Sequence, residues 1–229
     1  MNSKILKIGH RGAMGHLAEN TIASIKKALG FGVDGIEIDV HLCKSGELVV
    51  FHDFTLDRMT NGSGEVGKHT LSELKKFKVN NDSEIPTLEE VLDEIDKKCF
   101  INIELKGKHT AKKTVEIIQH YISEKGWDYD DFLVSSFQHH ELETVYNQNK
   151  SIQLAVLTKA NVMEAIELAK TINAKTIHPN VALVTRDNIA MAQENGYRVN
   201  VWTVNDLETI ARMKAYEVNG IISDFPDRL

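Results

Sequence analysis

Acidic side chains at alternating positions in two apolar runs suggest a cation site. Glu37 and Asp39 lie two residues apart in GIEIDVHLC, and Glu104 lies in CFINIELKG. Side chains two residues apart on a strand point to the same face, and carboxylates on a buried face are costly unless a positive charge neutralises them. Because all three donors are oxygen atoms, we predict that they bind a divalent cation, Mg²⁺ or Ca²⁺, rather than Zn²⁺. An E-x-D pair alone is more often the solvent-facing side of a strand, so the prediction depends on the neighbouring groups.

Cationic side chains accompany these acids. Arg11 ends the run KIGHR, and Lys106 shares a strand face with Glu104. An arginine holds phosphate oxygens through a bidentate fork. A helix is predicted to begin at AENT with Asn20 as its N-cap, and helix N-termini favour anions. We therefore expect Arg11 and Lys106 to bind a phosphate group.

Histidines and aromatic residues complete the candidate site. His10 and His52 stand where apolar runs end, and histidines beside a metal and a phosphate indicate proton transfer at a phosphoryl centre. Phe137 and Trp202 also stand near run ends and are predicted to bind the substrate. By composition alone a residue such as Trp202 is more often core packing, but its position is one where an aromatic ring can stack on a substrate. His178 lies near a run end without an obvious partner. The remaining histidines considered are assigned to surface or helix positions: His41, His69, His109, His120, His139 and His140.

Eight apolar runs that alternate with amphipathic stretches must position these groups. The runs are 5–12, 35–43, 99–107, 132–137, 152–158, 176–181, 197–204 and 220–226. Such alternation is typical of parallel strands with crossover helices. Eight of them predict an α/β fold, a (β/α)8 TIM-type barrel, whose chemistry lies at the C-terminal ends of the strands. A doubly wound open sheet is the alternative.

A ninth run, 47–53, breaks the alternation. Only KSG separates it from the preceding run, and a parallel crossover needs about a dozen residues or more. This run is therefore predicted to fold back as an antiparallel hairpin strand. Residues 54–86 are predicted to form a small insertion with a short helix over 70–77. No linker interrupts the pattern, so residues 1–229 are predicted to form a single domain.

Composition excludes several classes of partner. The formal net charge of −6 does not favour a nucleic-acid partner, which usually requires a basic face. No run reaches membrane-spanning length, and no signal peptide is recognised, so no stable membrane insertion is expected. The two cysteines, Cys43 and Cys99, form neither a metal-binding spacing nor a disulfide framework, which favours a reducing compartment. These features predict a soluble, cytoplasmic protein of undetermined oligomeric state.

An ordered series of short motifs extends along nearly the whole chain: GHRG, ENT, GIEIDVHLCKSGELVVFHD, LDRMTNGSGEVG, TLSEL, IPTLEEVL, INIELKG, SSF, VWTVND and GIISDFP. In this order they resemble the glycerophosphodiester phosphodiesterase family. The resemblance implies a TIM-type barrel and metal-dependent hydrolysis of a small glycerophosphodiester to sn-glycerol 3-phosphate and an alcohol. It implies that His10 and His52 form the general acid/base pair. It implies metal ligation by Glu37, Asp39 and Glu104, and phosphate binding by Arg11 and Lys106. The attacking nucleophile is either water or the neighbouring glycerol hydroxyl, and the latter would give a cyclic phosphate.

Other functions remain as alternatives. A phosphoinositide-type phospholipase would need an apolar rim or a basic patch to meet a bilayer, and aromatic residues make up only 7% of the chain. A lysophospholipid substrate requires only a modest apolar groove. A non-catalytic phosphodiester binder would be marked by loss of a histidine or a ligand, and none is lost. The paired histidines argue against an unrelated metal-dependent barrel such as an aldolase.

Overall fold

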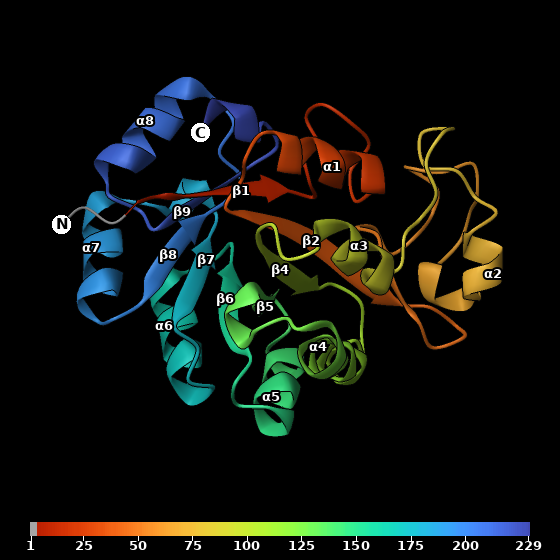
Figure 1. Ribbon diagram of the computed structural model, residues 1–229. Helices are drawn as coiled ribbons and strands as arrows, with labels where there is room; N and C mark the ends of the chain where they lie inside the picture. The colour runs from red at the N-terminus through yellow and green to blue at the C-terminus, as the bar shows by residue number, and fades with distance from the viewer. Residues whose placement is uncertain (1–3) are drawn as a thin grey trace.

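The computed structural model describes residues 4–229, and its centre is a closed ring of eight parallel strands (Figure 1). The strands are β1 (Leu6–His10), β2 (Gly35–Leu42), β4 (Phe100–Leu105), β5 (Phe132–Ser136), β6 (Gln153–Thr158), β7 (Thr176–Pro179), β8 (Arg198–Val201) and β9 (Gly220–Ser223). Their order is β1-β9-β8-β7-β6-β5-β4-β2, and β2 pairs with β1 to close the ring. This confirms the predicted TIM-type barrel and excludes the open sheet.

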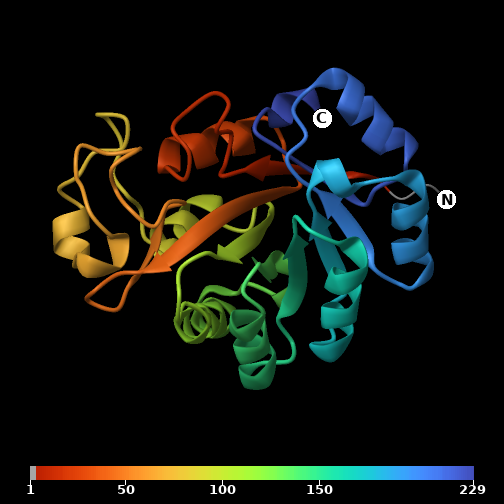
Figure 2. The same cartoon turned by 180° about the vertical axis from the view of Figure 1, so that it is seen from behind.

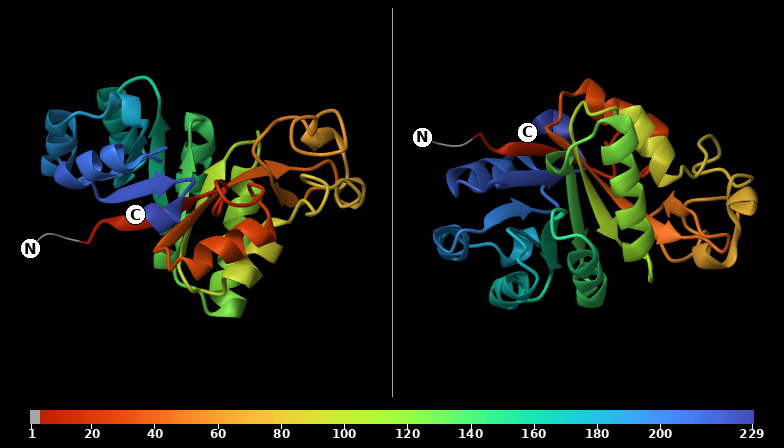
Figure 3. Two further views of the ribbon diagram at one scale, coloured as in Figure 1. Left: turned by 90° about the horizontal axis from the view of Figure 1, so that it is seen from above. Right: turned by 60° about the horizontal axis from the view of Figure 1, so that its bottom comes forward.

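Helices surround the ring, as Figure 3 shows from two directions. They are α1 (Ile22–Gly30), α3 (Leu88–Ile95), α4 (Ala111–Lys125), α5 (His139–Gln148), α6 (Val162–Thr171), α7 (Arg186–Glu194) and α8 (Leu207–Ala215). No helix within residues 4–229 combines the length and apolar character needed to cross a membrane.

The N-cap of α1 differs from the prediction. Thr21, not Asn20, caps the helix, and its side chain accepts the N–H of Ser24 at 3.2 Å. Asn20 precedes the cap in the left-handed region, with φ 58°, and its side chain donates to Asp39 at 2.9 Å. Asn20 and Thr21 are both common N-cap residues, so residue type alone did not show which of them caps the helix. The side chain of Asn20 is engaged by Asp39, which lies on a strand distant in the sequence.

Successive side chains of β2 point alternately to the hydrophobic core and to the interior of the barrel. Ile36, Ile38 and Val40 belong to the hydrophobic core between the barrel and its helices. Glu37 and Asp39 therefore point into the barrel, since successive side chains alternate between faces. His41 is a correction to the sequence prediction: it lies on β2, 3% exposed, and burial lowers its pKa. His41 is buried because it belongs to a strand whose other residues are buried, although its side chain is polar.

The predicted hairpin and insertion are present, outside the ring (Figures 1 and 2). Strand β3 (Leu48–Val50) pairs antiparallel with β2. The insertion contains η1 (Val66–Lys68) and α2 (Leu71–Leu74), so the helix is shorter than the predicted 70–77. Phe77 packs against a small separate hydrophobic cluster around Leu56, Val66 and Leu74 instead of extending that helix.

Candidate active site

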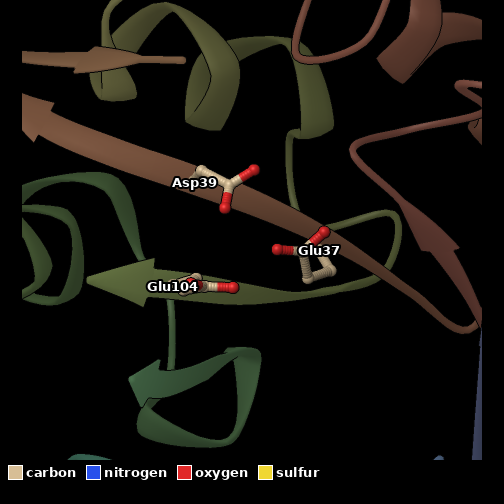
Figure 4. A group of neighbouring side chains, drawn as sticks. All are labelled: Glu37, Asp39 and Glu104. Carbon is tan, nitrogen blue, oxygen red and sulfur yellow. The ribbon is translucent and has the colours of Figure 1, made fainter. Parts of the chain in front are cut away.

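Three carboxylates from β2 and β4 meet inside the barrel (Figure 4). Strand register pairs Asp39 with Glu104, and Glu37 lies two residues earlier on β2. One oxygen from each of the three side chains lies within 4.8 Å of the others. All three residues are buried, with 4%, 1% and 8% of Glu37, Asp39 and Glu104 exposed. The structure thus brings together the predicted metal ligands.

Burial and mutual repulsion shift the pKa values of these carboxylates. Burial, and then the charges of Asp39 and Glu104, raises the pKa of Glu37 well above its ordinary value. Burial, followed by the charge of Asp39, raises the pKa of Glu104 to about 7. Burial also disfavours the charged form of Asp39, but Arg11, His52 and Lys106 outweigh it and lower its pKa. A cluster of oxygen donors whose negative charges repel one another fits a hard divalent cation.

Arg11 and Lys106 contact this cluster. Arg11 Nε lies 3.4 Å from Asp39 Oδ2, and its backbone N–H donates to Glu37 Oε2 at 3.0 Å. Lys106 Nζ lies 3.2 Å from Glu104 Oε1 and 3.9 Å from Asp39 Oδ1. The two predicted phosphate-binding cations are therefore beside the predicted metal ligands.

The backbone turn that presents Arg11 depends on its neighbours. Arg11 has φ 49° and Gly12 has φ 84°, both in the left-handed region. A Cβ on Gly12 would approach Ser24 Oγ at 2.5 Å, so only glycine fits there. The Ser24 hydroxyl donates to the carbonyl of Arg11 at 2.9 Å and stabilises the turn.

His10 is held by a carboxylate from the last strand's end. Its Nδ1 lies 2.5 Å from Asp224 Oδ1, and its Nε2 lies 3.8 Å from Glu37 Oε2. Asp224 also accepts from the side-chain amide of Asn205 at 2.7 Å. The ring thus directs Nε2 toward the carboxylate cluster while Nδ1 is fixed from behind.

His52 is held by a longer chain of charges. Its Nδ1 lies 2.7 Å from Asp53 Oδ1, and Arg58 Nε donates to Asp53 Oδ2 at 2.6 Å. Arg58 Nη2 also donates to Glu19 Oε1 at 2.7 Å, and Glu19 accepts from Arg11 Nη1 at 2.8 Å. Hydrogen bonds from Arg58 lower the pKa of Asp53 to about 2. Burial lowers the pKa of His52, which favours its neutral form.

Sequence reasoning missed Arg58 and Glu19. Both lie in recognised motifs, LDRMTNGSGEVG and ENT, but neither received a role. The only available signal was their occurrence in those motifs, because residues 19 and 58 are 39 positions apart and no local spacing relates them.

An apolar wall forms part of the lining of the same cavity, whose volume is about 280 Å³. The predicted aromatic residues are both there, and their rings pack edge to face with centroids 5.6 Å apart. Trp202 Nε1 donates to the carbonyl of His178 at 2.7 Å. His178 is fully buried, and burial lowers its pKa to about 3. The cavity is lined by His10, Arg11, Glu37, His52, Asn102, Glu104, Lys106, Phe137, Leu157, Lys159, His178, Trp202 and Ile222.

A larger groove of about 570 Å³ lies outside the barrel, beside α1, α3 and the end of the insertion. Its lining includes Lys75, Glu84, Glu90, Asp93 and Glu94, and none of the barrel-mouth residues. The chemistry therefore concentrates in the smaller cavity.

Comparisons with known proteins identify the relatives of this chain. A model described as "Glycerophosphoryl diester phosphodiesterase family" matches residues 10–228. The chain is 36% identical over 239 residues to a glycerophosphodiester phosphodiesterase of Caldanaerobacter subterraneus subsp. tengcongensis, a match that covers 99% of this chain and 96% of the relative. It is 38% identical over 235 residues to one from Bacillus altitudinis, covering 96% and 94%. A solved phosphodiesterase of Oleispira antarctica, in complex with the product sn-glycerol-3-phosphate, matches with a TM-score of 0.88 at 27% identity, covering 96% and 93%.

Proposed function

This chain belongs to the glycerophosphoryl diester phosphodiesterase family, and from that premise we propose that it hydrolyses glycerophosphodiesters to sn-glycerol 3-phosphate and an alcohol. The reaction depends on a divalent cation, Mg²⁺ or Ca²⁺, and on two histidines. The observation that carries the proposal is the position of His10 and His52, each fixed at Nδ1 by a carboxylate, on the cavity that Glu37 and Glu104 also line. Residues 1–229 act in it as one catalytic domain.

The carboxylates would hold the cation. Glu37, Asp39 and Glu104 would each supply an oxygen ligand, the donor type that Mg²⁺ and Ca²⁺ prefer. When bound, the cation supplies Lewis-acid polarisation of the phosphoryl oxygens. Arg11 and Lys106 bind the remaining negative charge of the diester, and their contacts to Asp39 and Glu104 keep them beside the cation site.

The histidines move the protons. One imidazole removes a proton from the attacking oxygen, which belongs either to water or to the adjacent glycerol hydroxyl. The attacking oxygen forms a new bond to phosphorus while the P–O bond to the head group breaks, and the other imidazole protonates the leaving alkoxide. Attack by water gives sn-glycerol 3-phosphate directly, whereas attack by the glycerol hydroxyl gives a cyclic phosphate that water then opens to the same product. Asp224 and Asp53 act as positioning residues, because each holds the Nδ1 side of its histidine and leaves Nε2 available for the substrate. Phe137 and Trp202 contact the substrate from the apolar wall.

Alanine variants of the two histidines test this assignment. General acid/base roles are each worth about 10²- to 10⁴-fold in rate, so H10A and H52A should lose most of kcat for release of sn-glycerol 3-phosphate from glycerophosphocholine. His120 is exposed on α4, outside the cavity, and H120A is the matched control that should retain wild-type kcat. Near wild-type kcat in either H10A or H52A, with unchanged thermal stability, would refute the two-histidine mechanism.

A further inference from the structure

Lys159 lies at the mouth of the catalytic cavity and has no role in the chemistry described above. It directly follows β6, two residues after Leu157, and both side chains line the cavity. The Thr158 hydroxyl oxygen accepts the N–H of Ala160 and of Asn161, each at 3.2 Å, and Asn161 caps α6. The connection between strand and helix is therefore short and hydrogen-bonded, and it keeps Lys159 over the opening.

The aromatic wall beneath Lys159 already faces ammonium groups. Lys159 Nζ lies 5.7 Å from the centroid of the Phe137 ring, and Lys106 Nζ lies 5.9 Å from it. Aromatic faces attract cations through the ring quadrupole. A quaternary ammonium on a substrate would have to compete with these two lysines for Phe137.

Lys159 differs from Lys106 in its charged neighbours. Lys106 is paired with Glu104 and Asp39, whereas within residues 4–229 no carboxylate oxygen lies within 4.0 Å of Lys159 Nζ. Arg11 is likewise paired, with Glu19 and Asp39. Among the cations that line the cavity within residues 4–229, Lys159 is therefore the one whose charge no neighbouring carboxylate engages.

A head group that extends from the cavity toward solvent would meet this charge. Asn102 and the fully buried His178 close the cavity on its barrel side. Alcohols of different size can be accommodated only on the open side, where the Lys159 side chain is exposed.

We propose that Lys159 determines head-group preference, so that the cavity favours glycerophosphodiesters of uncharged or anionic polyhydroxy alcohols over those of cationic amines. This inference rests on the proposed function and adds the substrate class. The lysine ammonium donates to hydroxyl or anionic oxygens of the head group, whereas it repels a choline-like cation and occupies the ring that such a cation would use.

The test compares glycerophosphoglycerol with glycerophosphocholine as substrates for the cation-loaded enzyme. The wild type should give the higher kcat/KM with glycerophosphoglycerol. K159E replaces a positive by a negative charge, and two charge units over roughly 7 Å in a water-like dielectric shift the ratio of the two kcat/KM values about fivefold to tenfold toward choline. K159Q should shift it about half as far on a logarithmic scale, and the shift should shrink as salt rises.

Lys150 provides a matched control. Its Nζ lies 5.4 Å from the Tyr146 ring, a similar cation–aromatic contact away from the cavity, so K150E should leave the ratio unchanged. A K159E ratio that moves less than twofold toward choline, or an equal shift in K150E, overturns the inference while hydrolysis itself stands. If the wild type hydrolyses neither diester, the proposed function fails and the head-group inference falls with it.

Discussion

Replacing Glu104 by Gln should have opposite effects on stability with and without the cation. Glu104 is 8% exposed, and burial together with the charge of Asp39 raises its pKa from 4.5 to about 7. In the absence of a cation, between about pH 4.5 and pH 7, the folded protein therefore retains a proton on Glu104 that the unfolded chain has lost. The resulting stability is complete below about pH 4.5 and is lost as pH rises through about 7.

The pKa shift sets the size of this effect. A shift of about 2.5 units corresponds to about 3 kcal/mol of differential stability. Glutamine keeps the shape of the side chain and removes the charge. In EDTA at pH 8, E104Q should be more stable than wild type by up to about 3 kcal/mol, equivalent to a Tm rise of roughly 6–12 °C for a chain of this size. At pH 5 the difference should be small.

The cation should reverse this order. A ligand at about 100 times its Kd stabilises the wild type by about 2.7 kcal/mol. E104Q lacks one of the three charged ligands and should gain much less. Thermal unfolding in EDTA and in excess Mg²⁺ or Ca²⁺, at pH 5 and pH 8, measures both effects. The exposed Glu116 of α4 provides the control, E116Q, which should behave as wild type. An E104Q variant that is less stable than wild type in EDTA at pH 8, or that gains as much from the cation, would contradict this reasoning.

Further predictions concern the positioning residues and the barrel interior. R58A should lower kcat about tenfold, because it removes the charged hydrogen bonds from Arg58 to Asp53. R58K should recover only part of the lost kcat, because lysine lacks the guanidinium fork. Steady-state kinetics of both variants, at a Tm equal to that of the wild type, checks this prediction. D224N should lower kcat with little change in KM, because Asp224 fixes His10 rather than the substrate; an effect confined to KM would refute it. His178 has a folded pKa of about 3 against an ordinary 6.5, so the unfolded chain takes up the proton first and the free energy of unfolding should fall by roughly 2–3 kcal/mol between pH 7 and pH 4.5. H178Q should lack that portion of the decline in urea unfolding, and a variant with the wild-type pH slope would contradict it.

Periodicity predicted the barrel, and tertiary contacts decided the details that it missed. Eight apolar runs and the three-residue gap before the ninth were sufficient for the ring and the hairpin, because strand spacing and crossover length are local properties. The N-cap of α1 and the last residue of α2 depend on contacts with residues that are distant in the sequence. Asn20 bonds to Asp39 and Phe77 packs on the insertion's own cluster, and neither contact has a sequence signal.

The candidate site divides in the same way. Residues on the strands were predicted because the two-residue strand period specifies the face that they share, as for Glu37 and Asp39. The charge chain that continues from Asp53 through Arg58 and Glu19 to Arg11 joins the insertion to the first strand's loop. Only the closed fold brings these segments together, and so their roles became visible only with the geometry.

The central claim is metal-dependent hydrolysis by this cavity, and the most direct measurement is release of sn-glycerol 3-phosphate from glycerophosphoglycerol, glycerophosphocholine and glycerophosphoethanolamine. The enzyme is assayed as prepared, after EDTA, and after Mg²⁺ or Ca²⁺ is restored, with E104Q in parallel. We predict release by the wild type that EDTA abolishes and one of the two cations restores, with E104Q strongly impaired throughout. Release that persists in EDTA, or the absence of release from all three diesters with either cation, would contradict the account.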